Sequence, residues 1–252
     1  PKGILHDLSI FLSKFAEPKK TLKTFNFLLF DHVGGLNTLF YSLFNKATSI
    51  VPKARTVESV IAACSKYEVE LLPTTPTFLR MLLMSDFVPE KIPPTLKVIS
   101  YGTEIMNEGT LKSLCELLPN VDFRQTYGIS ELGVFSVKSA GRSSVFFKIG
   151  GEGVETRIKN NVLQIKTDKR MVGYLNYPSP FDENDWYDTK DVVQERNGFL
   201  KIIGRDSDMI NVSGLKFMAL DVEQVIMRYD NILFAKVVAK DNPITGQHCE
   251  VN

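Results

Sequence analysis

Residues 69–84, Val-Glu-Leu-Leu-Pro-Thr-Thr-Pro-Thr-Phe-Leu-Arg-Met-Leu-Leu-Met, join a short, mostly apolar run to a helical pattern that begins at Pro76. Proline is well tolerated in the first turn of a helix, because its missing N–H would have no partner there. The stretch therefore predicts a strand over Val69–Leu72, ending at Pro73, and a helix over Pro76–Met84. The same strand-then-helix order repeats on both sides of it, and this repetition decides the fold class.

Further strands and helices alternate along the first half of the chain. Spacing of apolar residues predicts helices over Leu5–Phe15, Asn37–Phe44, Thr56–Tyr67 and Asn107–Leu118. Apolar or β-prone runs predict strands over Leu22–Phe30, Ser49–Val51, Thr95–Ser100 and Val121–Thr126. Strands and helices that alternate at this spacing form βαβ units, so we expect an α/β fold with a mostly parallel sheet and flanking helices.

The pattern changes after about Gly141. Short alternating strands with Gly, Asn-Asn or Asn-Gly turns predict an antiparallel β region, with strands over Ser144–Ile149, Val154–Lys159, Val162–Thr167 and Phe199–Ile203. A helix over Asp221–Arg228 and a strand over Leu233–Ala239 then predict the start of a small α+β lobe. We expect three parts, which are an α/β part (1–140), a β subdomain (141–204) and a hinge with a partial C-terminal lobe (205–252).

The composition indicates a globular protein with balanced charge. Of 252 residues, 44% are apolar, and 30 Lys and Arg residues face 29 Asp and Glu residues, for a net charge of +1. That balance offers no electrostatic case for binding nucleic acid or an anionic membrane. Apolar runs are far shorter than the roughly 20 residues of a membrane span. Three cysteines without a CxxC pair favour a reducing compartment, so we expect a cytoplasmic protein.

Polar residues follow two of the predicted parallel strands, at the edge where open α/β sheets bind their ligands. One segment is Ser100-Tyr101-Gly102-Thr103-Glu104, and the other is Thr126-Tyr127-Gly128-Ile129-Ser130-Glu131. In the second, a hydroxyl followed by a carboxylate could contact a phosphate and hold Mg²⁺, which prefers hard oxygen ligands. Taken alone, each segment is more typical of an ordinary glycine-containing turn.

Two later segments carry charged side chains with the same ambiguity. In Trp186-Tyr187-Asp188-Thr189-Lys190-Asp191, a carboxylate could accept two hydrogen bonds from a sugar diol, or the segment could be an acidic surface turn. Gly204-Arg205-Asp206-Ser207-Asp208 lies at the start of the last lobe. Arg205 could contact a ribose or phosphate, and the polar residues after it could form an interdomain hinge or a charged turn.

His32 lies in an apolar context, in Phe30-Asp31-His32-Val33-Gly34-Gly35. A histidine in such surroundings is more often a packed, hydrogen-bonded residue than a catalytic one. The glycine pair that follows would let either a ligand or another backbone segment approach closely.

In this order, the motifs resemble the adenylate-forming superfamily, which contains acyl-CoA synthetases, luciferases and the adenylation domains of nonribosomal peptide synthetases. Tyr127–Glu131 matches its Tyr-Gly-x-Thr/Ser-Glu motif, and Pro1-Lys2-Gly3 looks like the end of its phosphate-binding loop. Tyr187–Asp191 resembles its Thr-Gly-Asp motif, with Lys190 in place of glycine. The remaining matches are Gly173-Tyr174 in the β subdomain, the hinge segment with Ser207 at the pivot, and Gly214–Glu223 at the opening of the mobile lobe.

The resemblance implies a role for each candidate side chain. Gly102, Thr103 and Glu104 would line the adenine and acyl pocket, and His32 would border the acyl region. Tyr127, followed by Gly128, would stack near adenine. Ser130 would contact the α-phosphate, and Glu131 would help to hold Mg²⁺. Asp191 would bind the ribose, with Arg205 as a second nucleotide contact.

The resemblance also implies an acid-thiol ligase. Such an enzyme joins a small-molecule carboxylate to ATP, forming an acyl-adenylate, and then passes the acyl group to a thiol of CoA or phosphopantetheine. Pro1 and Asn252 resemble cut ends, so we expect a fragment that lacks most of the phosphate-binding loop and a C-terminal lysine. Because each such contact is worth on the order of 10²–10³ in rate, we expect the isolated fragment to be almost inactive.

Two alternatives remain open at this level. One is an adenylation domain that loads an acyl carrier protein, which a neighbouring carrier domain would indicate. The other is a non-catalytic adenylate-binding module, which the departures at Lys190 and Ser207 allow. A dinucleotide-binding dehydrogenase is disfavoured, because no GxGxxG follows a predicted strand.

Overall fold

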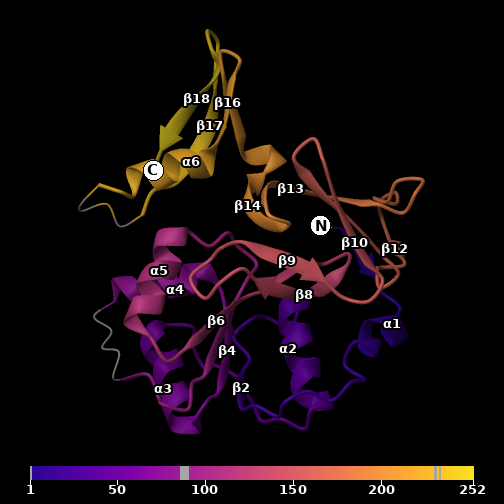
Figure 1. Cartoon of the computed structure of the whole chain (residues 1–252), viewed down its shortest axis with the longest axis vertical. Coiled ribbons are helices and arrows are strands. Elements are labelled where there is room, and N and C mark those ends of the chain that lie inside the picture. Colours follow the sequence, from indigo (N-terminus) through magenta and orange to yellow (C-terminus); the bar gives the residue numbers. More distant parts are fainter. Residues whose placement is uncertain (1, 86–90, 230–231, 233) are drawn as a thin grey trace.

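A five-stranded parallel sheet forms the centre of the computed structural model, which describes residues 2–85, 91–229, 232 and 234–252. Its strands lie in the order β3-β2-β4-β5-β6 (Figure 1). Their bounds are Thr24–Phe25 for β2, Ser49–Ile50 for β3, Leu71–Thr74 for β4, Val98–Tyr101 for β5 and Asp122–Gln125 for β6. All the pairs within it are parallel, so the predicted α/β fold class is confirmed.

Helices lie on both sides of this sheet. They are α1 (Leu8–Ser13), α2 (Val33–Phe44), α3 (Val57–Tyr67), α4 (Pro76–Met84) and α5 (Glu108–Leu117). Helices α3, α4 and α5 lie to one side of the sheet and α2 to the other (Figure 1). Fully buried side chains from α3, α4 and α5 pack against β4 and β5, among them Val60, Leu79, Leu114, Leu72 and Ile99. This packing holds the sheet in place, and the parallel strands β5 and β6 end at the same edge of it.

Side-chain caps explain where the helices begin. Asp7, Thr56, Thr75 and Asn107 each accept a hydrogen bond from a backbone N–H of the first helical turn. Such a cap stabilises a helix by about 1 kcal/mol. The predicted bounds of α4 are confirmed at both ends, since Thr75 and Pro76 together mark its start.

Helix α2 begins four residues earlier than the apolar pattern predicts. The Nδ1 atom of His32 accepts a hydrogen bond from the Gly34 N–H at 3.1 Å and caps the helix, so both glycines lie inside it. A Cβ atom on Gly35 would lie 1.9 Å from the Leu29 carbonyl oxygen. The glycine pair therefore admits a neighbouring backbone segment, one of the two possibilities that the sequence left open.

Several predicted elements have different bounds in the structure. Helix α1 covers only Leu8–Ser13, β5 begins at Val98 instead of Thr95, and β9 begins at Phe147 instead of Ser144. The apolar run over Leu22–Phe30 contributes only the two residues of β2, because the chain turns towards α2 soon afterwards. Strand β4 continues through Pro73 to Thr74 instead of ending at the proline. Pro73 lies beyond the Thr24–Leu71 pair, where β4 has lost its β2 neighbour, so a proline is tolerated there.

A seven-stranded antiparallel sheet follows, in the order β10-β11-β13-β14-β9-β8-β7. Its strands are β7 (Tyr127–Ile129), β8 (Gly133–Ser139), β9 (Phe147–Gly150), β10 (Val154–Lys159), β11 (Val162–Thr167), β13 (Tyr187–Arg196) and β14 (Phe199–Arg205). Antiparallel pairing thus begins at Tyr127, before the change in pattern near Gly141. The predicted Asn160-Asn161 and Asn197-Gly198 turns have positive φ at both residues, as tight hairpins require.

The last part of the chain is a small α+β lobe. It contains the short helix η2 (Asp206–Asp208), β15 (Met209–Val212), β16 (Leu215–Met218), α6 (Ala219–Ile226), β17 (Val237–Asn242) and β18 (Gly246–Val251). It projects from the rest of the molecule above β14 (Figure 1). The strand predicted over Leu233–Ala239 begins instead at Val237, and Leu233 lies outside the described residues. Within the described ranges, every helix is too short or too polar to cross a bilayer.

Candidate functional site

Side chains from three strands of the antiparallel sheet meet at one buried carboxylate. The Tyr127 hydroxyl donates a hydrogen bond of 2.6 Å to Oδ2 of Asp191. The Arg205 Nε lies 3.0 Å from Oδ1 of the same carboxylate. Asp191 and Arg205 are directly paired across β13 and β14, and Tyr127 begins β7. The fold therefore brings together three residues that are far apart in the sequence.

The surroundings of Asp191 are unusual for a carboxylate. Its side chain is buried, and this burial raises the pKa of Asp191 above its ordinary value of 3.8, although the Tyr127 hydrogen bond and Arg205 both act to lower it. Burial also raises the pKa of Tyr127, followed in size by the effect of the Asp191 charge, so its hydroxyl keeps its proton and donates. Each Asp191 oxygen still has a lone pair for one further donor.

A cavity of about 250 Å³ opens in front of these residues. It lies at the carboxyl ends of β5 and β6, where open α/β sheets bind ligands. Its lining comes from the loop after β5, the junction of β6 with β7, and the start of the small lobe. Besides the three residues above, it contains Thr103, Glu104, Ile105, Met106, Gln125, Thr126, Gly128, Val145, Ile202 and Asp208.

Close contact between Gly102 and Thr126 shapes one side of this cavity. A Cβ atom on Gly102 would lie 2.2 Å from Thr126 Oγ1 and 2.9 Å from the Thr126 carbonyl oxygen. The Thr126 hydroxyl donates to the Tyr101 carbonyl at 3.1 Å. Only glycine fits at position 102, because any side chain would push the ends of β5 and β6 apart.

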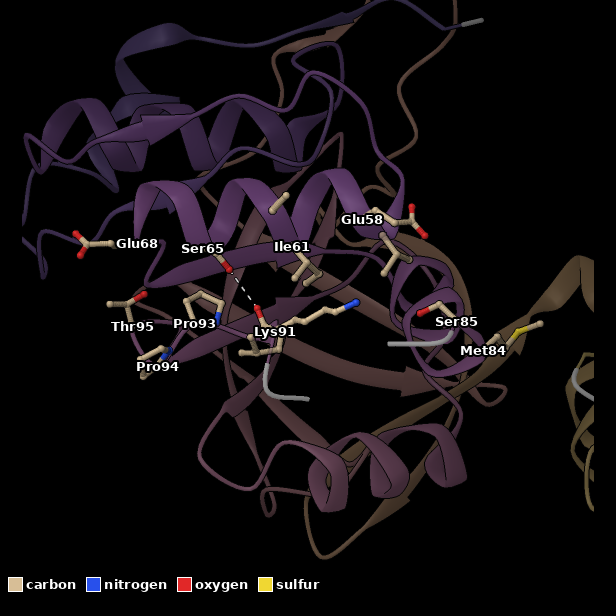
Figure 2. Close-up of a pocket in the computed structure, with 13 residues that line it drawn as sticks. Glu58, Ile61, Ser65, Glu68, Met84, Ser85, Lys91, Pro93, Pro94 and Thr95 are labelled. Carbon is tan, nitrogen blue, oxygen red and sulfur yellow. Dashed lines mark hydrogen bonds between the residues drawn. The ribbon is translucent and has the colours of Figure 1, made fainter. Parts of the chain in front are cut away.

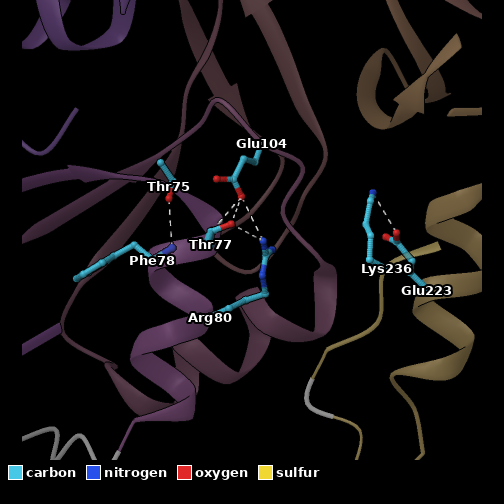
Figure 3. Close-up of polar contacts among 7 residues, drawn as sticks. All are labelled: Thr75, Thr77, Phe78, Arg80, Glu104, Glu223 and Lys236. Carbon is cyan, nitrogen blue, oxygen red and sulfur yellow. Dashed lines mark hydrogen bonds and ion pairs between the residues drawn. The ribbon is translucent and has the colours of Figure 1, made fainter. Parts of the chain in front are cut away.

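Glu104 lines the cavity, but its carboxylate is engaged with α4. Its Oε2 atom accepts hydrogen bonds from the Thr77 N–H at 3.1 Å, the Thr77 hydroxyl at 2.5 Å and Arg80 at 3.2 Å (Figure 3). A carboxylate is favourable at a helix N-terminus, where unpaired N–H groups carry partial positive charge. Glu104 therefore anchors the loop that borders the cavity.

Figure 3 also shows Lys236 and Glu223, an ion pair of 3.2 Å within the small lobe.

A second cavity of about 160 Å³ shares Thr103, Thr126 and Gly128 with the first. His32 lies on its wall, together with Leu28 and side chains from the start of α2. The structure thus places His32 in a neighbouring hollow, although its ring also caps α2. Two adjacent cavities that share lining residues suit a ligand with two chemically different parts.

Ser130 and Glu131 lie outside both linings, in the turn between β7 and β8. The Ser130 carbonyl lies 2.7 Å from Nε2 of His6. Oε1 of Glu131 accepts a hydrogen bond of 2.5 Å from the Tyr174 hydroxyl. The structure therefore brings Tyr127, Gly128, Thr103, Glu104, Asp191 and Arg205 around one cavity. Ser130 and Glu131 lie a few residues beyond it, and Gly102, which packs against Thr126, lines neither cavity.

The side chains near Glu131 show whether the predicted Mg²⁺ fits there. No group of three or more His, Cys, Asp or Glu side chains suited to a metal occurs among the residues that the structure describes. Mg²⁺ is commonly held by one or two carboxylates together with substrate phosphates and water. Glu131 supplies a single carboxylate, which fits that arrangement.

Lys190 adopts a backbone conformation that favours glycine. Its φ angle is 62°, in the left-handed region, where the side chain of an L-residue is strained. The Asp188 carboxylate compensates in part, because it accepts hydrogen bonds from the Lys190 N–H and from its ammonium group, both at 3.0 Å. The turn before Asp191 thus has the glycine-like geometry even though the residue is lysine.

A larger cavity, of about 1020 Å³, lies away from these residues, between α3 and the end of α4 (Figure 2). None of the site residues expected from the sequence lines it. Its walls include Ile61, Met84 and Pro93, on both sides of segment 86–90, which lies outside the described residues.

Sequence reasoning missed several residues that position this site. Thr126 separates the two cavities, Arg80 and Thr77 hold Glu104, and Tyr174 holds Glu131. Thr126 and Tyr174 each belong to a motif already singled out, so their position was a usable signal. Arg80 carries no such signal, because nothing in the sequence of α4 shows that its N-terminus meets the loop after β5.

The open parallel sheet, with a cavity beyond the carboxyl ends of its strands, has the arrangement in which α/β proteins generally bind their ligands. A family model described as AMP-binding enzyme matches residues 1–167, about two thirds of the chain. The chain belongs to this family, so the resemblance to the adenylate-forming superfamily is confirmed.

The chain is also similar to named proteins. It is 24% identical to acyl-CoA synthetase 7 of Caenorhabditis elegans, over 88% of the chain and 44% of that protein. It is 23% identical to 4-coumarate–CoA ligase-like 6 of Arabidopsis thaliana, over 86% of the chain and 42% of that protein. The chain therefore spans less than half the length of these two relatives.

Solved structures show the same fold. One is the anthranilate CoA ligase AuaEII in complex with anthranoyl-AMP, with a TM-score of 0.85 and 16% identity, over the whole chain and 54% of that protein. Another is the amide bond synthetase McbA of Marinactinospora thermotolerans, with a TM-score of 0.84 and 18% identity, over the whole chain and 56% of that protein.

Proposed function

We propose that this chain carries the adenylate-binding part of an acid-thiol ligase, which activates a carboxylate with ATP and transfers the acyl group to CoA. The observation that carries the proposal is the buried Asp191 carboxylate, held by Tyr127 and Arg205 at the wall of a cavity. Both of its oxygens can accept one more hydrogen bond, as recognition of a ribose diol requires. The relatives named as acyl-CoA synthetases and CoA ligases support the same reaction.

In the first half-reaction, a carboxylate oxygen of the substrate attacks the α-phosphorus of ATP, and pyrophosphate leaves. Catalysis of such a step is mostly positioning and neutralisation of developing charge. Asp191 and Arg205 would fix the ribose, so that the α-phosphate extends past Gly128 towards Ser130. The second cavity, beside His32, would hold the body of the carboxylate substrate.

Glu131 would be the residue that holds Mg²⁺ beside the phosphates. The chemistry that the ion supplies when bound is neutralisation of phosphate charge. In the second half-reaction, the small lobe would move about Ser207, and the thiol of CoA would displace AMP from the acyl carbonyl. Ser207 lies in the three-residue helix η2, directly between the two lobes, where a few changed backbone angles would move the whole lobe.

Binding of AMP to the intact protein that carries this sequence tests the site. Asp191→Asn keeps the shape of the side chain but removes its charge, and we expect it to weaken AMP binding by at least about tenfold. Asp188→Asn is the matched control, because Asp188 lies three residues away and its carboxylate binds Lys190 instead of lining the cavity. Equal AMP affinity in the wild type and Asp191→Asn would contradict the proposal.

Pyrophosphate release with ATP and a panel of carboxylates tests the reaction, and the acceptor decides among the related alternatives. Acyl transfer to CoA supports the ligase that we propose. Transfer only to a phosphopantetheinylated carrier protein would indicate a carrier-loading adenylation domain. AMP binding without pyrophosphate release from any carboxylate would indicate a non-catalytic module.

A further inference from the structure

The amino-terminal segment is tied to the Gly173-Tyr174 motif by a small antiparallel sheet. Ile4 of β1 (Ile4–Leu5) pairs with Tyr174 of β12 (Gly173–Tyr174), and Leu5 pairs with Gly173. Backbone hydrogen bonds continue the pairing on both sides. Lys2, two residues before β1, is therefore held beside the Tyr174 ring.

Tyr174 contacts an anion and a cation at once. Its hydroxyl donates to Oε1 of Glu131 at 2.5 Å. The Lys2 ammonium lies 4.9 Å from the centre of its ring and 5.4 Å from that of the Tyr177 ring. Distances of this size are typical of cation–π attraction. One aromatic side chain thus connects Lys2 to Glu131, although 129 positions separate the two in the sequence.

The hydroxyl of Tyr174 acts as a fixed donor. Burial raises the pKa of Tyr174 to about 12, with the hydrogen bond to Glu131 as the next cause, so the phenol stays protonated near neutral pH. Tyr187 interacts with both residues. Burial, followed in size by the Glu131 charge, raises the pKa of Tyr187. Tyr174 therefore holds Glu131 through Oε1, and the Tyr187 hydroxyl is a second polar neighbour of the same carboxylate.

We propose that Tyr174 is a positioning residue, which fixes Glu131 and Lys2 relative to each other at the phosphate end of the nucleotide site. The proposal rests on the function proposed above. Lys2 is exposed and Glu131 is only half-buried, so both side chains would otherwise sample several rotamers. Contact with a single ring restricts both before the nucleotide arrives, which lowers the entropy lost on binding.

Binding of ATP to the intact protein, measured by calorimetry at a series of Mg²⁺ concentrations, tests this inference. Tyr174→Phe removes the donor but keeps the ring, and we expect it to raise the Mg²⁺ concentration at half-saturation by about 3- to 10-fold. Tyr174→Leu removes the ring as well, and we expect it also to weaken Mg²⁺-free ATP binding by about 2- to 5-fold. AMP lacks the outer phosphates, so its affinity should stay within about twofold in both variants, as expected for intact ribose contacts.

Tyr67 offers a matched control, because the Lys66 ammonium lies 5.2 Å from its ring on the exposed side of α3. Tyr67→Phe and Tyr67→Leu should leave all three measurements unchanged. An unaltered Mg²⁺ midpoint in Tyr174→Phe, or equal losses of AMP and ATP affinity, would overturn the inference while leaving the proposed function intact. A wild-type protein that binds neither nucleotide would refute the proposed function, and this inference with it. Should Tyr174→Leu fail to fold, the Phe variant still decides the outcome.

Discussion

Tyr127 and Asp191 are 64 positions apart in the sequence, yet the hydroxyl of one donates a hydrogen bond of 2.6 Å to the carboxylate of the other. Each residue is 6% exposed, so water can replace neither partner. The bond joins β7 to β13 and holds the carboxylate at the wall of the cavity. We therefore expect changes at this pair to affect both stability and nucleotide binding.

Tyr127→Phe should lower the free energy of unfolding at neutral pH by about 1–3 kcal/mol, because the buried Asp191 charge loses a donor. Urea unfolding of the two proteins measures the difference. Tyr229→Phe is the control, since Tyr229 is 68% exposed, and it should change the free energy by less than about 0.5 kcal/mol. Equal stability of Tyr127→Phe and the wild type would show that this hydrogen bond is not stabilising.

The pH dependence of stability should carry the signature of Asp191. Burial raises its pKa above 3.8 in the folded state, so the folded protein binds this proton more tightly than the unfolded chain does. Stability from this group is therefore fully present below the unfolded pKa and is lost as pH rises through the folded pKa. The loss amounts to about 1.4 kcal/mol for each unit by which the pKa is raised.

Asp191→Asn has no such proton, so it isolates the effect. Unfolding free energies of both proteins between about pH 3 and pH 7 should show the wild type losing stability relative to the variant as pH rises, with a constant difference above that window. A difference that is independent of pH, or that grows in favour of the wild type, would contradict the raised pKa.

Gly102→Ala should destabilise the protein by about 2–4 kcal/mol, because the new methyl group cannot fit against Thr126 without moving backbone. It should also weaken AMP binding, since the methyl group would push apart the ends of β5 and β6, which border the cavity. Gly150→Ala is the control, because nothing lies within 4 Å of a Cβ there and its φ is ordinary. That variant should be neutral or more stable by up to about 1 kcal/mol, as thermal unfolding of both would show.

Lys190→Gly should stabilise the protein by up to about 1 kcal/mol, because it removes left-handed strain, while the lost contact with Asp188 is exposed and weak. AMP affinity should be unchanged. Lys46→Gly tests the same backbone change away from the site, at a φ of 52°. If Lys190→Gly is less stable than the wild type while Lys46→Gly is more stable, the Lys190–Asp188 contact outweighs the strain.

Glu104 and Arg80 should act as one unit. Glu104→Gln and Arg80→Gln should each lower stability by about 1 kcal/mol, and the double variant should lose less than the sum, because both changes break the same contact. Chemical denaturation of the four proteins provides the double-mutant cycle. Strict additivity would show that Glu104 is held by Thr77 alone.

Much of the architecture was predictable from local patterns. The bounds of α4, β10 and β11 are those that apolar spacing and turn residues predict, because each element has clear chemistry at both ends. Strand β13 was harder to predict, since the acidic segment Trp186–Asp191 is also typical of a surface turn. Its pairing with β11 and β14 overrides that local preference.

The sequence by itself determined the fold class, the family and the motif segments, because hydrophobic periodicity and characteristic residue order are local properties of the chain. Only the tertiary structure decided which side chains meet. It joins Tyr127 and Arg205 at Asp191, turns Glu104 towards α4, and places Tyr174 between Lys2 and Glu131. These contacts depend on strand order and register, which arise from packing between distant segments and leave no local mark in the sequence.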